Sequence, residues 1–398
     1  MQRIVLCAVS LLLVAFIAAC GGSGSTAAVS TYDHPTKAFT PYSTSMGGAV
    51  QGHRLQLVQG EVTTLAGAAG TIGFFNYTGS ATAIGTAARF NQPNDITTYD
   101  GSTFYVADYG NGAIRKITSS GVVTTMKFKD LDTGLPIGFN RPAGITTDGK
   151  YLYVSDSALH VVRVIDLYDN TAITIGSTSG VAGSVDSTVM ADVRFNNPKG
   201  ITTDRVNIFV ADCGNQTVRW IKKIGTYNYA VYTLAGSSGA IGSTDGKPDA
   251  ARFYIPSRIT TDGANLYLTD FGNHTIRSID ILSGNVDTLA GTAGALDRET
   301  NGSLDGDGKA ARFNQPNGIT TDGSSLYVTD SYHNTIRVID LGSPHTVTTL
   351  PLQGKSLLHF PLGLTTDGVS LFIADPFILN SNSNEYTYSN SILKVSNP

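Results

Sequence analysis

Charge is scarce in this sequence, and the charged residues are scattered along it. Only 15% of the residues are Asp, Glu, Lys or Arg, and the formal net charge is −4. No cluster of Lys or Arg resembles the basic footprint of a nucleic-acid-binding protein, so no nucleic-acid partner is expected. Three cysteines are too few for a disulfide framework, and 44 glycines with so little charge disfavour a helical bundle. An all-β domain is the first expectation.

The sequence also offers no apolar run long enough for an ordinary transmembrane helix. The run from Ile4 to Ile17 follows Arg3, is too short to span a bilayer comfortably and leads through two alanines into Cys20. This pattern predicts a signal peptide over residues 1–19.

The small residues before Cys20 resemble the lipobox of bacterial lipoproteins. The resemblance implies that Cys20 is acylated, becomes the mature N-terminus and anchors the protein in the cell envelope. Because Gly21 stands where a sorting Asp would stand, it also implies the outer membrane in a cell with two membranes. Ordinary cleavage, with an incidental Cys20, is the alternative.

Residues 20–57 are rich in Gly, Ser, Thr and Ala without a sustained hydrophobic period, which predicts a lipidated flexible tether. Residues 58–398 are dominated by internal repetition instead. A Phe-x-x-Pro entry followed by a Tyr-Val-x-Asp strand recurs six times, although the sixth copy is degenerate. The entry residues are Phe90, Phe139, Phe195, Phe253, Phe313 and Phe360.

Each repeat contains four short β-rich segments separated by turn residues, as expected of one antiparallel propeller blade. The Phe entry, an Asp-Gly turn, the Tyr-Val-x-Asp strand end and an Asn-x-x-Ile-Arg strand together resemble the NHL repeat family. The resemblance implies a six-bladed β-propeller of four-stranded antiparallel blades. Members of this family commonly serve as interaction platforms.

The sixth repeat ends after its third strand, at about Val395. Residues 62–67 copy the fourth-strand sequences of other repeats, such as Val286 to Gly291. An N-terminal strand is therefore predicted to complete the last blade, which would close the ring and remove exposed sheet edges.

Carboxylates and arginines that recur in every blade are best explained by a structural role that every blade requires. The six aspartates that end the second strands and the six in the Asp-Gly-type turns are predicted to accept structural hydrogen bonds. The recurring arginines of the third strands are predicted to pair with neighbouring carboxylates. In the first repeat, the strand-end aspartate is Asp108, the turn aspartate is Asp100 and the third-strand arginine is Arg115.

Function is expected where the repeats differ. The variable segments fall between blades and between second and third strands, at 68–88, 128–138, 177–193, 237–251, 292–311, 352–358 and 376–390. These connections open on one face of a propeller, which is the predicted binding face. Polar residues near the channel mouth on this face are the candidate binding residues: Asn94, Asp95, Lys199, Arg258 and Asn317. Asp95 and Arg258 belong to opposite blades; solvation or local pairing is the alternative for both.

Three histidines on the same face, His160, His274 and His333, could ligate zinc if their rings converge. The family places polar residues here in any case. The run Asp305-Gly306-Asp307-Gly308 suggests calcium but lacks the EF-hand ligand spacing, so a Gly-rich turn is favoured.

No nucleophile elbow, phosphate loop or zinc-protease motif is found. The favoured function is a scaffold that binds a protein, a peptide or a glycan. The alternative is a propeller lyase or hydrolase with a metal-assisted site at the channel mouth, built from Asp95 and the histidines.

Overall fold

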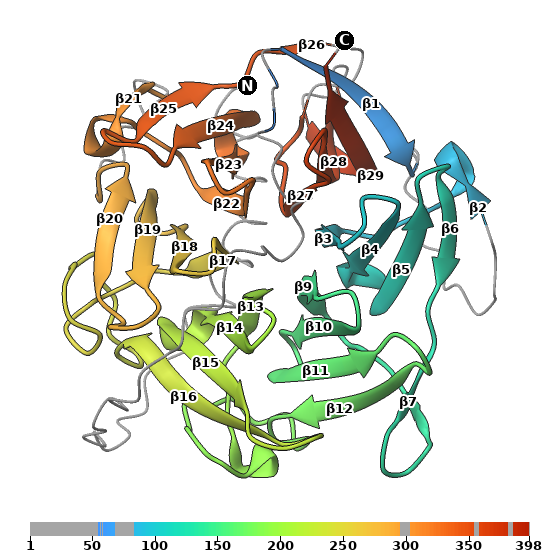
Figure 1. The fold of residues 1–398 in the computed structure, drawn as a ribbon. Helices are drawn as coiled ribbons and strands as arrows, with labels where there is room; N and C mark the ends of the chain where they lie inside the picture. The colour runs from blue at the N-terminus through green and yellow to red at the C-terminus, as the bar shows by residue number, and fades with distance from the viewer. Residues whose placement is uncertain are drawn as a thin grey trace.

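The computed structural model describes residues 55, 57, 59–67, 83–294, 303–353, 358–380 and 385–397, and the structural statements below concern these residues. They form six sheets arranged as a ring (Figure 1). Among them, no helix is long and apolar enough to cross a membrane. The predicted signal peptide 1–19, the acylation site Cys20 and the tether 20–57, apart from Leu55 and Leu57, lie outside the described residues.

The sheets are the six blades, numbered I to VI along the chain, and the first strand of each lies nearest the axis (Figure 1). Blades I to III contain β3 (Pro93–Thr98), β4 (Thr103–Asp108), β5 (Ala113–Thr118) and β6 (Val122–Thr125); β9 (Pro142–Thr147), β10 (Tyr151–Asp156), β11 (Val161–Asp166) and β12 (Thr171–Ile175); and β13 (Pro198–Thr203), β14 (Asn207–Asp212), β15 (Thr217–Lys223) and β16 (Tyr229–Gly236). Blades IV to VI contain β17 (Pro256–Thr261), β18 (Asn265–Asp270), β19 (Thr275–Asp280) and β20 (Val286–Ala290); β22 (Pro316–Thr321), β23 (Ser325–Asp330), β24 (Thr335–Asp340) and β25 (Thr346–Thr349); and β27 (Leu364–Thr366), β28 (Leu371–Asn380), β29 (Glu385–Ser396) and β1 (Gly60–Ala66).

The ring closes as the sequence predicts. Strand β1 pairs antiparallel with β29, with Glu61 opposite Ser396 and Val62 opposite Val395. The ordered chain extends beyond this strand, because Leu55 is buried in the core of the last two blades and its N–H donates to Asp322 Oδ2 (2.9 Å). The propeller therefore includes part of the segment that the composition predicts as a tether.

Several connections between blades form additional outer strands rather than loops on one face. These strands are β2 (Ala83–Ile84), β7 (Phe128–Asp130), β8 (Pro136–Ile137), β21 (Gly306–Asp307) and β26 (Leu352–Gln353). They lie at the perimeter of the ring (Figure 1), so blades I, II, V and VI have more than four strands. The variable material thus contributes less to the predicted binding face than the sequence suggests.

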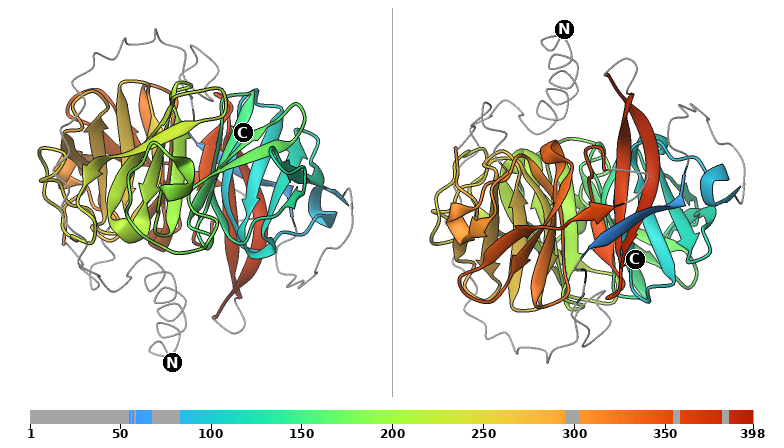
Figure 2. Two further views of the ribbon diagram at one scale, coloured as in Figure 1. Left: turned by 90° about the horizontal axis from the view of Figure 1, so that it is seen from below. Right: turned by 90° about the horizontal axis from the view of Figure 1, so that it is seen from above.

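The connection between the second and third strands of blade VI is a hairpin. The ladder between β28 and β29 continues through the insertion, from Phe377 opposite Tyr388 to Asn380 opposite Glu385. In each of the five other blades the corresponding connection is a short turn, and in three of these it contains a 3-10 helix: η2 (Tyr109–Asn111), η4 (Cys213–Asn215) and η6 (Ser331–His333). The hairpin therefore extends beyond the body of the ring (Figure 2).

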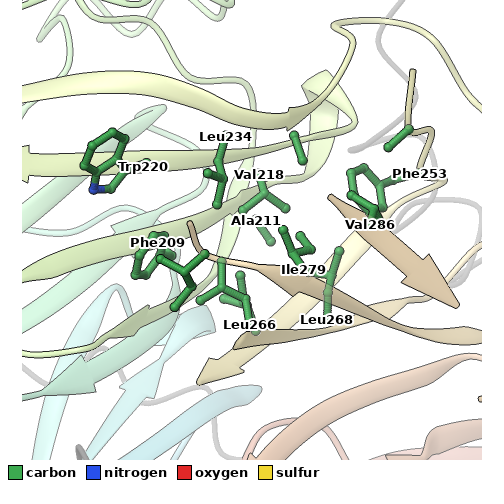
Figure 3. Packing of buried hydrophobic residues seen from close by; sticks show 14 residues of the cluster. Phe209, Ala211, Val218, Trp220, Leu234, Phe253, Leu266, Leu268, Ile279 and Val286 are labelled. Atoms are coloured by element: carbon green, nitrogen blue, oxygen red, sulfur yellow. The ribbon is translucent and has the colours of Figure 1, made fainter. Parts of the chain in front are cut away.

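The hydrophobic core lies between neighbouring blades, because the apolar side chains on each face of a sheet pack against those of the next sheet. Between blades III and IV, Phe209, Leu234, Phe253 and Leu266 belong to one cluster (Figure 3). Each large side chain buried in this way contributes about 1.5–3 kcal/mol relative to exposure. The three remaining 3-10 helices are in connections between blades: η1 (Gly85–Ala87), η3 (Met190–Asp192) and η5 (Gly308–Ala310).

Candidate functional site

The aspartate that ends each second strand is buried within a cluster of donors. In blade IV, Asp270 accepts hydrogen bonds from the Tyr254 N–H (2.8 Å), Asn273 Nδ2 (2.7 Å) and Arg277 Nη1 (2.8 Å). Blades I and III repeat this set of three donors around Asp108 and Asp212. A buried carboxylate requires such partners, so the predicted structural role is confirmed.

In blades III, IV and V the arginine of the cluster stacks on the entry phenylalanine and reaches a second carboxylate. Arg277 lies over the Phe253 ring (5.1 Å), and its Nη2 donates to Asp245 (2.7 Å) in the preceding connection. Arg337 makes the same contact with Asp305 (2.8 Å), whose carboxylate also accepts from Thr349. Asp305, the first residue of the Asp-Gly-Asp-Gly run, therefore has a structural role, which agrees with the favoured interpretation of this run as a turn.

Blade VI departs from this arrangement. Leu393 pairs with Ile373 at the position where Arg277 pairs with Leu268 in blade IV. Asp375 is 2% exposed and accepts the N–H of His359 (3.1 Å). Burial raises the pKa of Asp375 well above its ordinary value, and no arginine opposes the shift.

Two of the candidate histidines connect neighbouring blades. His160 Nδ1 accepts the Asn197 N–H (2.9 Å), and His274 Nδ1 accepts the Gln315 N–H (3.0 Å). Side-chain oxygens make the equivalent bond at three further junctions, where the acceptors are Gln216, Asn334 and Asn390. All five acceptors have positive φ. We call them the junction acceptors.

The remaining junction, between blades I and II, has Gly112 at this position. Its φ is 57°, and a Cβ atom there would lie 2.7 Å from the Phe139 carbonyl oxygen. The close approach to this carbonyl favours glycine here, since the five junction acceptors show that the left-handed φ alone does not exclude a side chain.

The third histidine has a different role. His333 takes the place of Asn273 in its own blade, and its Nδ1 lies 3.1 Å from Asp330 Oδ2. Across the described parts of the chain, no group of three or more His, Cys, Asp or Glu residues is arranged to hold a metal ion. His160, His274 and His333 each serve their own blade or junction instead of converging.

The candidate residues of the channel mouth do come together, but they are buried. Asn94, Asp95, Lys199, Arg258 and Asn317 are each at most 7% exposed. Arg258 crosses the axis: its Nε lies 3.4 Å from Asp95 Oδ2, and its Nη2 donates to the Asn94 carbonyl (2.9 Å) and the Ala143 carbonyl (3.2 Å). Residues of blades I, II and IV are thereby joined at the centre of the ring.

The crossing depends on small residues at the equivalent positions of the other blades. A Cβ atom on Gly363 would lie 2.0 Å from Asp95 Oδ1. Asp95 also accepts the N–H groups of Ile96 and Ile145, both at 3.1 Å. A Cβ atom on Gly200 would lie 2.6 Å from the Arg258 Cα. Glycine also occupies the equivalent position in two further blades, as Gly144 and Gly318.

Burial shifts the protonation of this central cluster. Loss of water raises the pKa of Asp95 to about 6, although Arg258 and the two backbone N–H groups oppose the shift. Loss of water also lowers the pKa of Lys199 to about 7, and the nearby Arg258 adds to that effect. The cluster can therefore change its charge near neutral pH.

Comparison with known proteins places this architecture in a family. No family model matches the sequence. Human NHL repeat-containing protein 2 is 26% identical over 306 residues, which cover 67% of this chain and 41% of the human protein. This chain is an NHL-repeat β-propeller protein. It spans less than half the length of the curated relatives that it matches.

Solved structures confirm the fold of the NHL propeller. A protein of unknown function from Bacteroides thetaiotaomicron superposes with a TM-score of 0.57 at 18% identity, over 84% of this chain and 75% of the other. An auxiliary nutrient binding protein from Bacteroides ovatus gives a TM-score of 0.55 at 14% identity, over 85% and 77% of the two chains. At these identities the likeness concerns the fold alone.

Sequence reasoning missed a ring of threonines in the channel of the NHL propeller. A cavity of about 60 Å³ extends from Asp95 and Arg258 toward the turns between the first and second strands. It is lined by one equivalent threonine from each blade: Thr97, Thr146, Thr202, Thr260, Thr320 and Thr365. The repeated Thr-Thr pair before each turn was the available signal.

Proposed function

We propose that this NHL propeller is an envelope-anchored lipoprotein that binds a protein, a peptide or a glycan. The predicted binding face carries the connections between second and third strands and those between blades. The lipobox-like sequence before Cys20 supports the anchor. The repeated polar groups support a scaffold, because they serve contacts within and between blades.

The β28–β29 hairpin is the observation that carries this proposal. It rises from the predicted binding face, where the other blades have shorter turns (Figure 2). Its base is held by an edge-to-face contact between Phe360 and Phe377, whose ring centroids are 5.8 Å apart. A raised element on a rigid ring is well suited to recognise a partner.

Two aromatic side chains lie on the same face, the exposed Tyr332 and the half-buried Tyr109. Tyr332 is 42% exposed, and Arg141 stacks on Tyr109 (5.6 Å). Aromatic rings of this kind contribute much contact area at low entropic cost to peptide and sugar recognition. The name of the Bacteroides ovatus protein, auxiliary nutrient binding, is consistent with a binding role for such a fold.

The enzymatic alternative gains no specific support from the described residues. Asp95 is buried against Arg258, and His160 and His274 act as junction acceptors. Elemental analysis of the purified protein, made without added metal, tests this alternative directly. Stoichiometric zinc that is lost in a His160→Ala/His274→Ala variant would revive it.

The binding role is tested with variants of the two faces. We expect Tyr332→Ala, and shortening of the hairpin to a tight turn after Phe377, to weaken binding to arrayed glycans, cell-wall fragments or peptides. Tyr168→Ala is the matched control, because Tyr168 is 96% exposed and lies in the turn between the third and fourth strands, on the opposite face. Equal losses in all three variants would contradict the assignment of the face.

The anchor is tested in a bacterial host with a fatty-acid label. The wild-type chain should incorporate the label and sediment with the membranes, whereas Cys20→Ala should do neither. Separation of the two membranes of the host then tests the predicted outer-membrane location. A wild-type protein that is cleaved but unlabelled would instead support ordinary signal-peptide cleavage.

A further inference from the structure

The outermost strands of the sheets are partly covered around the ring. Additional outer strands pair with the fourth strands of blades I, II, V and VI, and they are β2, β7, β21 and β26. In blade III, Asp186 Oδ2 accepts the Thr233 N–H of β16 (2.9 Å), and in blade IV Val286 of β20 bridges to Gly246. These contacts occupy backbone groups that could otherwise pair with another chain.

The β28–β29 hairpin, which extends beyond the ring, differs in this respect (Figure 2). Strand β1 pairs with β29 only as far as Ile392, and the chain then leaves at Gly67, whose N–H donates to the Gly85 carbonyl (3.1 Å). Strand β29 itself begins at Glu385 and pairs with β28 from there. Within the ranges that the structure describes, no strand pairs with residues 385–389 on the side where β1 lies farther along β29. We call this side of residues 385–389 the open edge.

The sequence of the open edge lacks the residues that usually prevent strand pairing. It reads Glu-Tyr-Thr-Tyr-Ser, with one charged residue and neither proline nor lysine. Proline and lysine are common guards of sheet edges, whereas tyrosine and threonine favour strands. In an antiparallel ladder, every second residue directs its N–H and C=O away from the paired strand. The open edge therefore presents a regular series of backbone donors and acceptors.

The opposite edge of the hairpin, on β28, is covered at its base. The Leu362 N–H donates to the Ala374 carbonyl (2.9 Å), and the ring of Phe360 packs edge-to-face on Phe377. The open edge of β29 is therefore the better site for an added strand.

We propose that the open edge binds an extended peptide segment of a partner protein, which adds as a strand beside β29 in line with β1. The inference rests on the proposed binding role of the hairpin and narrows its ligand to one class. In strand addition the backbone hydrogen bonds supply affinity, and alternate side chains of the peptide supply specificity. A glycan has no regular series of N–H and C=O groups to match this edge.

Methylation of the peptide backbone tests the mode of binding. Random octapeptides displayed on phage are selected on the purified full-length protein, and a selected peptide is synthesised with an N-methyl group at one residue at a time. A peptide in a ladder directs every second N–H to the neighbouring strand. We expect methylation at alternate residues to weaken binding about tenfold and methylation at the intervening residues to have little effect. A scan without this alternation would refute strand addition.

Two neighbouring residues of the open edge provide matched variants of the protein. Tyr386 and Thr387 are consecutive in the ladder with β28, so one of them directs its N–H to β28 and the other directs its N–H outwards. Proline is tolerated where the N–H faces away from the sheet. We therefore expect one of Tyr386→Pro and Thr387→Pro to abolish peptide binding without lowering the midpoint of thermal unfolding. Thr387→Val keeps its N–H and should bind as the wild type does; wild-type binding by both proline variants would contradict the proposal.

Shortening of the hairpin after Phe377 separates this inference from the proposed function. If shortening abolishes binding but the methylation scan shows no alternation, the hairpin binds its ligand in another way and only strand addition fails. If shortening leaves binding unchanged, the hairpin is not the binding element and both proposals fail. Sedimentation equilibrium tests a second copy of this chain as the occupant. A wild-type dimer that is absent in the proline variants would overturn the peptide in favour of that copy.

Discussion

Blades IV and VI have the same arrangement of four strands, but their buried carboxylates have different hydrogen-bond partners. Asp270 has an amide, a backbone N–H and an arginine as donors, whereas Asp375 has the N–H of His359 and a leucine in place of the arginine. Blade VI is also the one that extends its second and third strands into a hairpin. The blade with the incomplete polar cluster is therefore the one with the largest departure from the repeat.

The comparison shows what the arginine contributes. In blade IV it joins the strand end to the entry phenylalanine and to Asp245 in the preceding connection. Blade VI has no equivalent bridge at Leu393, and its fourth strand comes from the other end of the chain. Single substitutions can convert one arrangement into the other, or weaken one of them.

The largest effect is expected when blade IV is given the leucine of blade VI. Arg277→Leu leaves the buried Asp270 without its cation and leaves Asp245 with only the exposed Lys309 (3.4 Å). Breaking a buried ion pair from one side typically costs about 3–5 kcal/mol. Urea denaturation measures the loss. The double variant with Asp270→Asn should recover part of it, and a loss below about 1 kcal/mol would show that the arginine is dispensable.

A smaller loss is expected at the centre of the ring. Arg258→Met removes the cross-ring contacts to Asp95, Asn94 and Ala143, and we expect a cost of about 2–4 kcal/mol. The loss is smaller because Arg258 pairs with one carboxylate at 3.4 Å, whereas Arg277 pairs with two, at 2.7 and 2.8 Å. Adding Asp95→Asn should recover stability in the Arg258→Met background; an additive further loss would argue against a direct pair.

The fold could be predicted because the same residues make the same structural contacts within each blade. The entry phenylalanine, the strand-end aspartate and the arginine recur because they contact one another within one blade, as Phe253, Asp270 and Arg277 do. The closing strand could be found for the same reason, since it carries the residues of a fourth strand. Local contacts leave a pattern at a fixed spacing along the chain.

Contacts between blades could be predicted less well. Sequence reasoning placed Asp95 and Arg258 in opposite blades, but their burial and pairing depend on the space that Gly363 leaves beside Asp95 and Gly200 beside Arg258. The junction acceptors were hidden because His274, Gln216 and Asn334 differ in type and share only an acceptor atom. The outer strand β7 pairs with β12 over two residues, too few to produce a periodic signal.

Removing the incompletely paired carboxylate of blade VI should stabilise the protein. Asp375→Asn is expected to add about 1–2 kcal/mol at neutral pH, because folding there must either bury the carboxylate with few donors or return a proton to it. The raised pKa of Asp375 means that the folded state holds its proton more tightly than the unfolded state. The contribution of Asp375 to stability is therefore most favourable in acid and falls as the pH rises above the unfolded pKa of about 4.

The gain from Asp375→Asn should consequently grow with pH. Denaturation at acid and neutral pH measures it, and Asp270→Asn is the matched comparison in blade IV, where the same change weakens contacts to Arg277 and Asn273 and should destabilise. A uniform gain at all pH values would mean that the charge of Asp375 is not the cause.

The smallest effect concerns a junction acceptor of blade IV. His274 Nδ1 can accept the Gln315 N–H only while that nitrogen carries no proton, and burial lowers the pKa of His274. Below the unfolded pKa of about 6.5, the unfolded state then binds more protons than the folded state. Stability from this junction is complete above that pH and is lost as the pH falls through it.

Blade III supplies the control for this junction, because Gln216 accepts the equivalent bond with an oxygen that does not titrate in this range. We expect His274→Gln to change stability at neutral pH by less than about 0.5 kcal/mol and to reduce the loss in acid. Gln216→His should introduce an additional acid loss at the next junction. If both variants follow the wild-type pH profile, the junction bonds do not depend on histidine protonation, and the acid sensitivity must arise from other groups.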